Sequence, residues 1–322
     1  LCMPEILRLI AAVTHFALVV GTNWLRDTCI IPGIQALPET DFVKPVDTRY
    51  MAHFTNTEIR EPAVQGRFYP SSRKSIFELI RQLDTSERYP VPTLKDISVL
   101  GAVLPYAGHV FSGYQTVPFF QFLTWEGHNP ETFVIVHPNH TGLGSPLALS
   151  PHLYWRNASG MLEVDQELAD LLGFPKEADA HRNEHSGEVL LPFIQYYVGE
   201  SDIKILPVCM SKQTFKTAEE LAESLYHAAN VLGRNIMILA SSDFTHFLPA
   251  PEGYEQDQIL LDTIFRKNPE EVEKTVRRNN LNACGYGPMM TLMIYSGMNS
   301  NEYSIMQMAR GHSGEVSPSH EV

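Results

Sequence analysis

The fold is decided by the stretch Ile236-Met237-Ile238-Leu239-Ala240-Ser241-Ser242-Asp243-Phe244-Thr245-His246. It opens with an apolar run of strand length, and two small residues lead from that run to a carboxylate and an imidazole. Ligands of α/β sheets bind outside the carboxyl ends of the strands, so this order places Asp243 and His246 where a site is expected. Because a buried aspartate without a partner is costly, we favour a functional role for this pair over a packing role.

Similar apolar runs recur along the chain and predict further buried strands, at Ser98–Leu104, Phe133–His137 and Ile203–Val208. Stretches with helical spacing lie between and after them, among them Gln166–Leu172, Ala218–Leu232 and Pro269–Arg278. Strands that alternate with helices are typical of a three-layer α/β/α domain. We therefore predict an α/β fold whose central sheet is mixed or mostly parallel.

The first part of the chain differs in composition from the rest. Leu9–Gly21 is mostly apolar but too short to span a membrane, and residues 22–60 are rich in Pro and Thr with weak periodicity. We expect residues 1–59 to form an N-terminal extension and linker outside the native domain, with Met51 as a natural start. The α/β domain is expected over residues 60–322.

The composition excludes several classes of protein. The formal net charge of −13, without a Lys/Arg run, argues against nucleic-acid binding and fits a cytoplasmic protein that does not enter the membrane. The four cysteines show no C-x-x-C spacing, which argues against a structural zinc knuckle and a disulfide framework. Cys209 follows an apolar run and is expected to be a buried strand thiol.

Tyr106 and His140 each follow one of the predicted strands. Tyr106 lies in Leu104-Pro105-Tyr106-Ala107-Gly108, and it is either a phenol ligand or hydrogen-bond donor of a site, or a packing residue in a tight turn. His140 lies further out on its loop than His137, and two histidines so close on a turn rarely both bind one metal. His140 is therefore the candidate metal ligand or general base of this loop.

A third motif is Glu184-His185-Ser186. Its acid, imidazole and hydroxyl cannot form a Ser-His-acid triad, because triad members converge from separate segments. His185 is a candidate for proton transfer, and the alternative is a helix start capped by Ser186 or Glu188. In the motif that opens this section, Asp243 either binds a metal or orients His246, and His246 is an acid/base candidate.

Cys284 lies in Asn282-Ala283-Cys284-Gly285, before an apolar run with helical spacing. A helix N-terminus favours the thiolate form of a cysteine. One thiol, several imidazoles and a carboxylate that converge at strand ends would make a soft-to-intermediate metal site or a nucleophilic site.

Taken in order, these motifs resemble the Memo family over about Arg60 to Val322. The resemblance is carried by Ala63-Val64-Gln65-Gly66-Arg67-Phe68-Tyr69-Pro70, Pro105-x-Ala107-Gly108, Pro138-Asn139-His140, Glu184-His185-Ser186, Leu191-Pro192, Ser241-Ser242-Asp243-Phe244-x-His246 and Cys284-Gly285-x-x-Pro288. It implies a fold similar to class III extradiol dioxygenases, which are non-haem iron enzymes. It also implies a pocket that holds iron or copper through two histidines and the cysteine. The matching positions here are Tyr106, His140 and Cys284, and Asp243 and His246 line the same pocket.

This chain departs from the family pattern at one of the implied ligands. The family usually has Pro-His-Ala-Gly where this chain has Pro105-Tyr106-Ala107-Gly108, so tyrosine replaces the first metal histidine. A neutral phenol binds divalent ions poorly, and we expect metal binding to be weakened, altered or lost. His109 could substitute only if the turn rearranged. Relatives also continue into a closing strand beyond Val322, so we expect the chain to be truncated.

Three functions remain open from the sequence. The first is a metal-dependent redox enzyme of the dioxygenase-like class, in which His246 or His185 moves a proton. The second is a binding module that takes a peptide or small-molecule ligand without a metal. The third, implied by the gene context of the family, is an accessory partner of a radical-SAM or AMMECR1-like protein.

Overall fold

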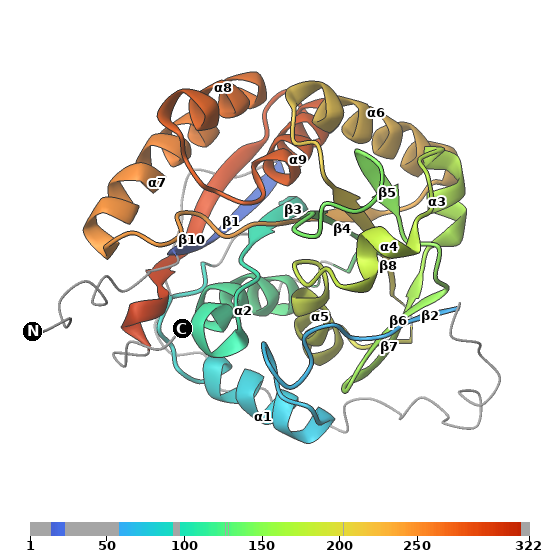
Figure 1. Cartoon of the computed structure of the whole chain (residues 1–322), viewed down its shortest axis with the longest axis horizontal. Coiled ribbons are helices and arrows are strands. Elements are labelled where there is room, and N and C mark those ends of the chain that lie inside the picture. The colour runs from blue at the N-terminus through green and yellow to red at the C-terminus, as the bar shows by residue number, and fades with distance from the viewer. Residues whose placement is uncertain are drawn as a thin grey trace, which may run out of the picture.

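The computed structural model describes residues 14–22, 58–92, 97–125, 127, 129–201 and 203–316, and its strands form one sheet (Figure 1). The centre of the sheet consists of parallel neighbours in the order β3 (Ser98–Leu104), β9 (Ile236–Ser241), β4 (Thr132–Pro138) and β8 (Lys204–Met210). Side chains of β9 and β4 are buried throughout, as expected for strands covered on both faces. The predicted α/β fold with a mixed, mostly parallel sheet is confirmed.

Shorter strands extend the sheet beyond β8. They follow in the order β7 (Gly160–Val164), β6 (Tyr154–Asn157) and β2 (Ile59–Arg60), and β5 (Leu147–Leu149) pairs separately with β8. At the other edge, β1 (Thr14–Thr22) and β10 (Ser304–His312) are antiparallel to their neighbours. The antiparallel strands therefore lie toward the outside and leave the parallel centre to build the site.

Helices cover both faces of the sheet, as Figure 1 shows. One face carries three helices that contact one another: α1 (Arg73–Asp84), α2 (His109–Trp125) and α5 (Leu191–Tyr197). The other face carries α3 (Gln166–Leu172), α6 (Phe215–Leu232), α8 (Pro269–Asn279) and α9 (Tyr286–Asn299), with α7 (Ala250–Phe265) beside α8. The short helices are α4 (Ala178–Arg182), η2 (Glu188–Leu190) and η3 (Ser313–Glu315).

Local signals explain where α6 begins and ends. The Thr214 side chain accepts a hydrogen bond from the backbone N–H of Thr217, and Gly233 ends the helix in the left-handed conformation. Leu221 and Leu225 lie on the buried face, as helical spacing predicts. No helix of the described residues has the length and apolar character that a membrane crossing needs.

The N-terminal strand β1 differs from the sequence prediction, which assigned residues 1–59 to an extension outside the domain. β1 lies between β3 and β10, and its residues Ala17, Leu18 and Val19 are fully buried. The prediction of an extension is therefore wrong for Thr14–Thr22, whose pairing partners lie far away in the sequence. Of the predicted linker over residues 22–60, residues 23–57 lie outside the described residues.

The topology brings the chemistry-bearing loops together. Because β3, β9 and β4 are parallel neighbours, the loops that follow them open at the same edge of the sheet. These loops carry Tyr106, His246 and His140, respectively.

Candidate functional site

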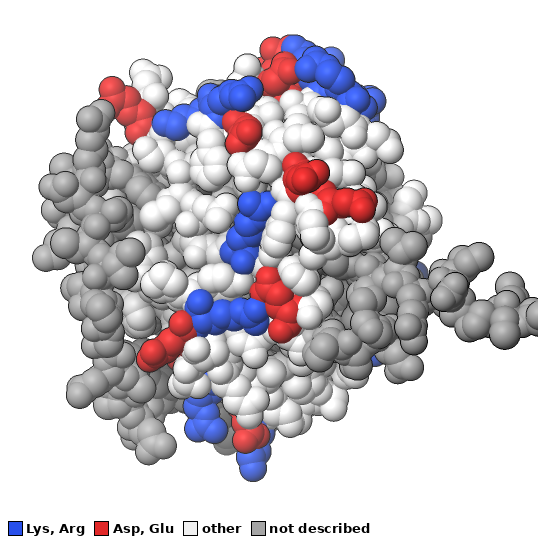
Figure 2. Space-filling view, turned by 90° about the vertical axis from the view of Figure 1, so that its left-hand side faces the viewer, with Lys and Arg blue, Asp and Glu red and all other residues white. Residues whose placement is uncertain are grey.

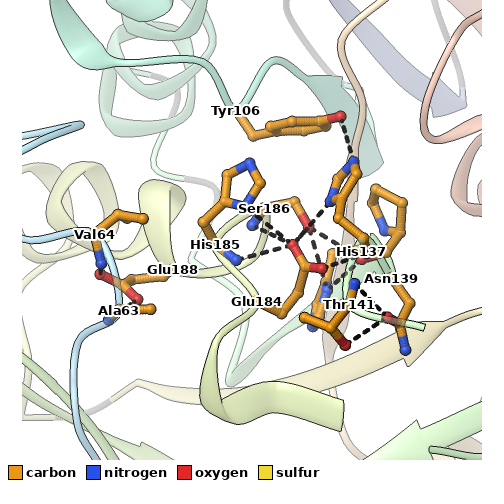
Figure 3. Close-up of polar contacts among 12 residues, drawn as sticks. Ala63, Val64, Tyr106, His137, Asn139, Thr141, Glu184, His185, Ser186 and Glu188 are labelled. Carbon is orange, nitrogen blue, oxygen red and sulfur yellow. Dashed lines mark hydrogen bonds and ion pairs between the residues drawn. The ribbon is translucent and has the colours of Figure 1, made fainter. Parts of the chain in front are cut away.

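Tyr106 and His140 form the first contact of the site (Figure 3). The Tyr106 hydroxyl lies 3.0 Å from His140 Nε2. Tyr106 is 4% exposed, and burial together with the negative charges of Asp243 and Cys284 holds the pKa of its phenol well above 10. Tyrosine at this position is therefore a neutral phenol that interacts with the imidazole nitrogen facing the site.

Glu184 organises the loop that carries His140. Its fully buried carboxylate accepts hydrogen bonds from the backbone N–H of His140 at 2.6 Å, His185 at 2.8 Å and Ser186 at 3.0 Å. It also lies 3.0 Å from His140 Nδ1 and accepts a bond from the Ser186 hydroxyl at 2.8 Å. A carboxylate on Nδ1 fixes the ring so that Nε2 points at the site. Burial opposes ionisation, but the bonds and charges of His140 and His137 hold the pKa of Glu184 well below its usual range.

His140, Glu184 and His185 have ligand atoms within 4.8 Å of one another, the composition of a two-histidine, one-carboxylate metal site. The hydrogen bonds argue against that use. Glu184 Oε1 already faces three donors, from His140, His185 and Ser186, besides the Ser186 hydroxyl. Since these donors fill the lone pairs of Oε1, this oxygen supports the ligand loop and is a poor metal ligand.

Cys284 and His246 form the second contact of the site. Cys284 Sγ lies 3.5 Å from His246 Nε2 and 3.8 Å from Nδ1, and the thiol is partly buried. Burial opposes ionisation of Cys284, but hydrogen bonds with His140 and His246 outweigh it and lower its pKa to about 6. Cys284 is thus mainly a thiolate at neutral pH, stabilised by its interactions with two imidazoles.

The same contacts raise the pKa of the imidazoles of His140 and His246. Burial lowers the pKa of His140, but its hydrogen bonds with Cys284 and Glu184 raise that pKa to about 10. The pKa of His246 is also raised, because the interaction with Cys284 outweighs the effect of burial. These interactions therefore favour the thiolate form of Cys284 together with the protonated forms of His140 and His246.

The turn that carries Cys284 is fastened to the segment after β9. The Cys284 N–H donates to the Asp243 carbonyl at 3.1 Å, and the Gly285 N–H donates to Ser242 Oγ at 2.8 Å. A Cβ on Gly285 would lie 2.2 Å from the Ser241 carbonyl oxygen, so glycine permits this approach. The thiol is thereby fixed beside the loop that carries His246.

Side-chain amides hold the turn from two sides. Gln213 Nε2 donates to the Cys284 carbonyl at 2.7 Å, and Gln213 Oε1 accepts from the Gly287 N–H at 2.7 Å. Asn282 Oδ1 accepts from the His246 N–H at 3.0 Å, and Asn282 Nδ2 donates to the His246 carbonyl at 2.8 Å. These contacts, which span long sequence separations, could not be inferred from the motifs.

Asp243 and His185 complete the cluster. Asp243 Oδ1 accepts a hydrogen bond from the Tyr106 N–H at 3.1 Å, so it orders the tyrosine turn. The His185 ring stacks against His140 with centroids 5.0 Å apart and meets the Tyr106 ring edge at 5.4 Å. Burial lowers the pKa of His185, which leaves it neutral at pH 7.

His109 lies away from the cluster. His109, which the sequence offered as a substitute for the missing histidine, is fully buried with Nε2 2.9 Å from the Val189 carbonyl oxygen. Its ring packs 4.5 Å from Phe193, in the core. His137 is also fully buried, and Cys209 donates to the Ala180 carbonyl from β8.

The structure changes the interpretation of Glu184, Ser186 and Glu188. Ser186 or Glu188 was considered as a helix cap, but η2 begins after Gly187 without a side-chain cap bond. Glu188 instead forms a buried ion pair with Arg60 and accepts hydrogen bonds from the Ala63 and Val64 N–H groups at 2.7 and 3.1 Å (Figure 3). Glu184 was not singled out as a site residue, because only the fold brings His140 to it.

Comparison with known proteins identifies the family of this chain. The family model described as Memo-like protein matches residues 60–321. A MEMO1 family protein of Methanopyrus kandleri is 36% identical over 268 residues, 80% of this chain and 93% of the relative. One of Archaeoglobus fulgidus is 38% identical over 242 residues, 74% of this chain and 87% of the relative. The resemblance inferred from the motifs is confirmed, and the chain belongs to the Memo family.

Proposed function

We propose that this chain is a metal-dependent redox protein whose site takes copper in its reduced state through Cys284 and His140, with His246 as a further donor. The observation that carries the proposal is the contact of Cys284 Sγ with His246 Nε2 at 3.5 Å, together with the interactions with His140 and His246 that lower the pKa of the thiol. Thiolate and imidazole together suit copper, and thiolate in particular favours Cu(I).

The donor set fits copper better than it fits iron. Non-haem iron(II) is held by at least three nitrogen or oxygen ligands, and the family histidine that would complete such a set is Tyr106 here. Its phenol stays neutral, because its pKa is raised by burial, and a neutral phenol is a poor ligand. Cu(I) accepts a thiolate with one or two imidazoles, so the loss of one nitrogen ligand is tolerated. The sequence alone predicts iron and copper as equal alternatives.

The residues of the cluster have separate roles in this proposal. Copper, when bound, would supply one-electron redox chemistry. His185 Nδ1 lies 3.4 Å from Glu184 Oε1, which leaves Nε2 of the neutral ring to accept a proton from a substrate hydroxyl. The raised pKa of His246 favours its protonated form, and Glu184 keeps His140 Nε2 directed into the site.

The contact between Tyr106 and His140 also favours a second candidate function. In the metal-free protein, His140 Nε2 faces the phenol at 3.0 Å and the pKa of the ring is raised to about 10. The nitrogen has no free lone pair until a metal displaces its proton. If none does so, the site binds a small-molecule or peptide ligand without a metal.

Competition for Cu(I) against a chromophoric chelator under anaerobic conditions separates the two candidates. The copper proposal predicts one tight site per chain in the wild type. Cys284→Ala should weaken it by more than about 100-fold, beyond the range seen when only a supporting group is lost.

Cys209→Ala is the matched control, because this thiol is fully buried and its pKa is raised by burial. It should leave copper binding unchanged. A wild type that fails to compete for copper, or equal losses in both cysteine variants, would contradict the proposal and favour the metal-free function.

A further inference from the structure

Three large apolar side chains are exposed shortly after the strands that lead to the cluster, one in the first turn of α2 and two on loops. Val110 is 50% exposed and lies four residues after Tyr106. Leu143 is 48% exposed and lies three residues after His140, and Phe247 is 71% exposed and directly follows His246. Single exposed apolar residues are ordinary on a protein surface, but these three share one setting.

That setting is the carboxyl edge of the parallel strands. Val110 follows β3, Phe247 follows β9 and Leu143 follows β4, and these strands are consecutive neighbours in the sheet. The loops are also joined through the site, by the Tyr106 contact with His140. The three apolar side chains therefore lie on neighbouring segments at the edge of the sheet that carries the polar cluster. We call Val110, Leu143 and Phe247 the apolar rim.

Phe247 is held exposed at a conformational cost. Its φ is +62°, in the left-handed region that residues other than glycine, asparagine and aspartate rarely adopt. Neighbouring contacts impose this conformation, since Asn282 bonds both backbone groups of His246 and Asp257 accepts from the Thr245 N–H at 3.0 Å. Strain that the surroundings maintain next to a site residue points to function.

The chemistry of the loops defines the ligand. The four segments 105–113, 138–145, 242–249 and 282–287 contain neither Lys nor Arg, so only imidazoles could supply positive charge for a phosphate there. Inside the rim lie the imidazoles and the thiol, which suit a hydroxyl or another polar group. Outside them, an exposed phenylalanine suits a planar apolar group.

We propose that the apolar rim binds the planar apolar part of a small uncharged ligand whose polar group points into the cluster, with Phe247 as the main specificity determinant. This inference goes beyond the copper proposal and does not depend on it, because the rim belongs to the protein alone.

Binding of 2-naphthol to the full chain, held metal-free with a chelator, tests the proposal through the intrinsic fluorescence of the probe. Phe247→Asn removes the ring while keeping a residue that tolerates the left-handed conformation, and should weaken binding by about tenfold. Phe247→Tyr keeps the ring and should bind within about twofold of the wild type. Val231→Asn is the matched control, since Val231 is 75% exposed on α6.

The thermal unfolding midpoint of Phe247→Asn should be unchanged or higher, since the variant relieves backbone strain. The proposal is overturned if the wild type does not bind 2-naphthol, if Phe247→Asn binds as well as the wild type, or if Val231→Asn weakens binding equally. A lower thermal midpoint in Phe247→Asn than in the wild type would show that the ring contributes to packing. Tighter binding of 2-naphthyl phosphate than of 2-naphthol would contradict an uncharged ligand. Because the protein is metal-free, failure here leaves the copper proposal standing.

Discussion

Glu184 and Glu188 lie four residues apart, and both are fully buried, yet they serve different parts of the molecule. Glu188 faces the segment that begins at Arg60, where it pairs with the guanidinium and accepts from the Tyr69 hydroxyl. Glu184 faces the cluster, where its bonds go to the loop of His140 and to the adjacent backbone.

The difference lies in the partners. Arg60 is always charged, so the Glu188 network keeps its electrostatics under all ordinary conditions. The histidine that Glu184 holds can gain or lose a proton and can take a metal. The Glu188 carboxylate therefore stabilises the fold. The Glu184 carboxylate positions a site whose charge can change.

The largest expected effect is the loss of stability when the Glu188 carboxylate is removed. Glu188→Ala leaves Arg60 buried without its counterion and should lower the free energy of unfolding by about 3–5 kcal/mol. Denaturant unfolding measures this loss. The Arg60 guanidinium also donates to the Glu184 backbone carbonyl, so the two networks touch through the main chain. Because the Glu184 side chain is unaltered, copper affinity per folded molecule should stay unchanged, and a large loss of affinity would show that the site depends on Arg60.

Glu184→Gln should act on the site more than on the fold. The neutral amide cannot hold the His140 ring with the same strength, so copper affinity should fall by about 10–100-fold, the range for supporting groups of metal ligands. Competition against a chelator measures it. If affinity stayed at the wild-type level while stability fell as far as in Glu188→Ala, Glu184 would be a second structural residue.

The pH dependence of thiol alkylation tests the charge state of Cys284, which lies in the cluster that Glu184 helps to order. Thiolates react and thiols do not, so Cys284 should become reactive as the pH rises through about 6. His246→Ala should move this midpoint upward, toward the ordinary value of about 8.5. Mass spectrometry after iodoacetamide treatment of the metal-free protein reports each site, and buried Cys209 should stay unmodified. An alkylation midpoint of Cys284 near the ordinary value would show that Cys284 is not a thiolate at neutral pH.

The smallest effect is expected where an ion pair is exposed. Glu61 pairs with Arg156, and their side chains are 48% and 37% exposed. Glu61→Gln should change the free energy of unfolding by less than about 1 kcal/mol, because water screens the pair. A loss comparable to that of Glu188→Ala would mean that burial is not what separates the two pairs.

Much of the fold could be predicted from the sequence because its signals are local. Ser98–Leu104 and Gln166–Leu172 are a strand and a helix with the predicted bounds, since apolar periodicity reports burial directly. β1 could not be placed, because its partners β3 and β10 lie far away in the sequence.

The site residues show the same limit. Residues after predicted strands could be named as candidates, because parallel topology sends strand ends to one edge. The sequence did not show that Glu184 supports His140, that Gln213 holds the Cys284 turn, or that His109 faces the core. These facts depend on contacts between segments, and residue type alone does not encode them.

The central claim is tested most directly by the metal content of the protein after anaerobic purification, measured by elemental mass spectrometry for the wild type and Tyr106→His. The account predicts about one copper and little iron per wild-type chain, and iron as well as copper in Tyr106→His, which regains a nitrogen ligand. Iron without copper in the wild type, or no metal in the wild type after exposure to Cu(I), would contradict it.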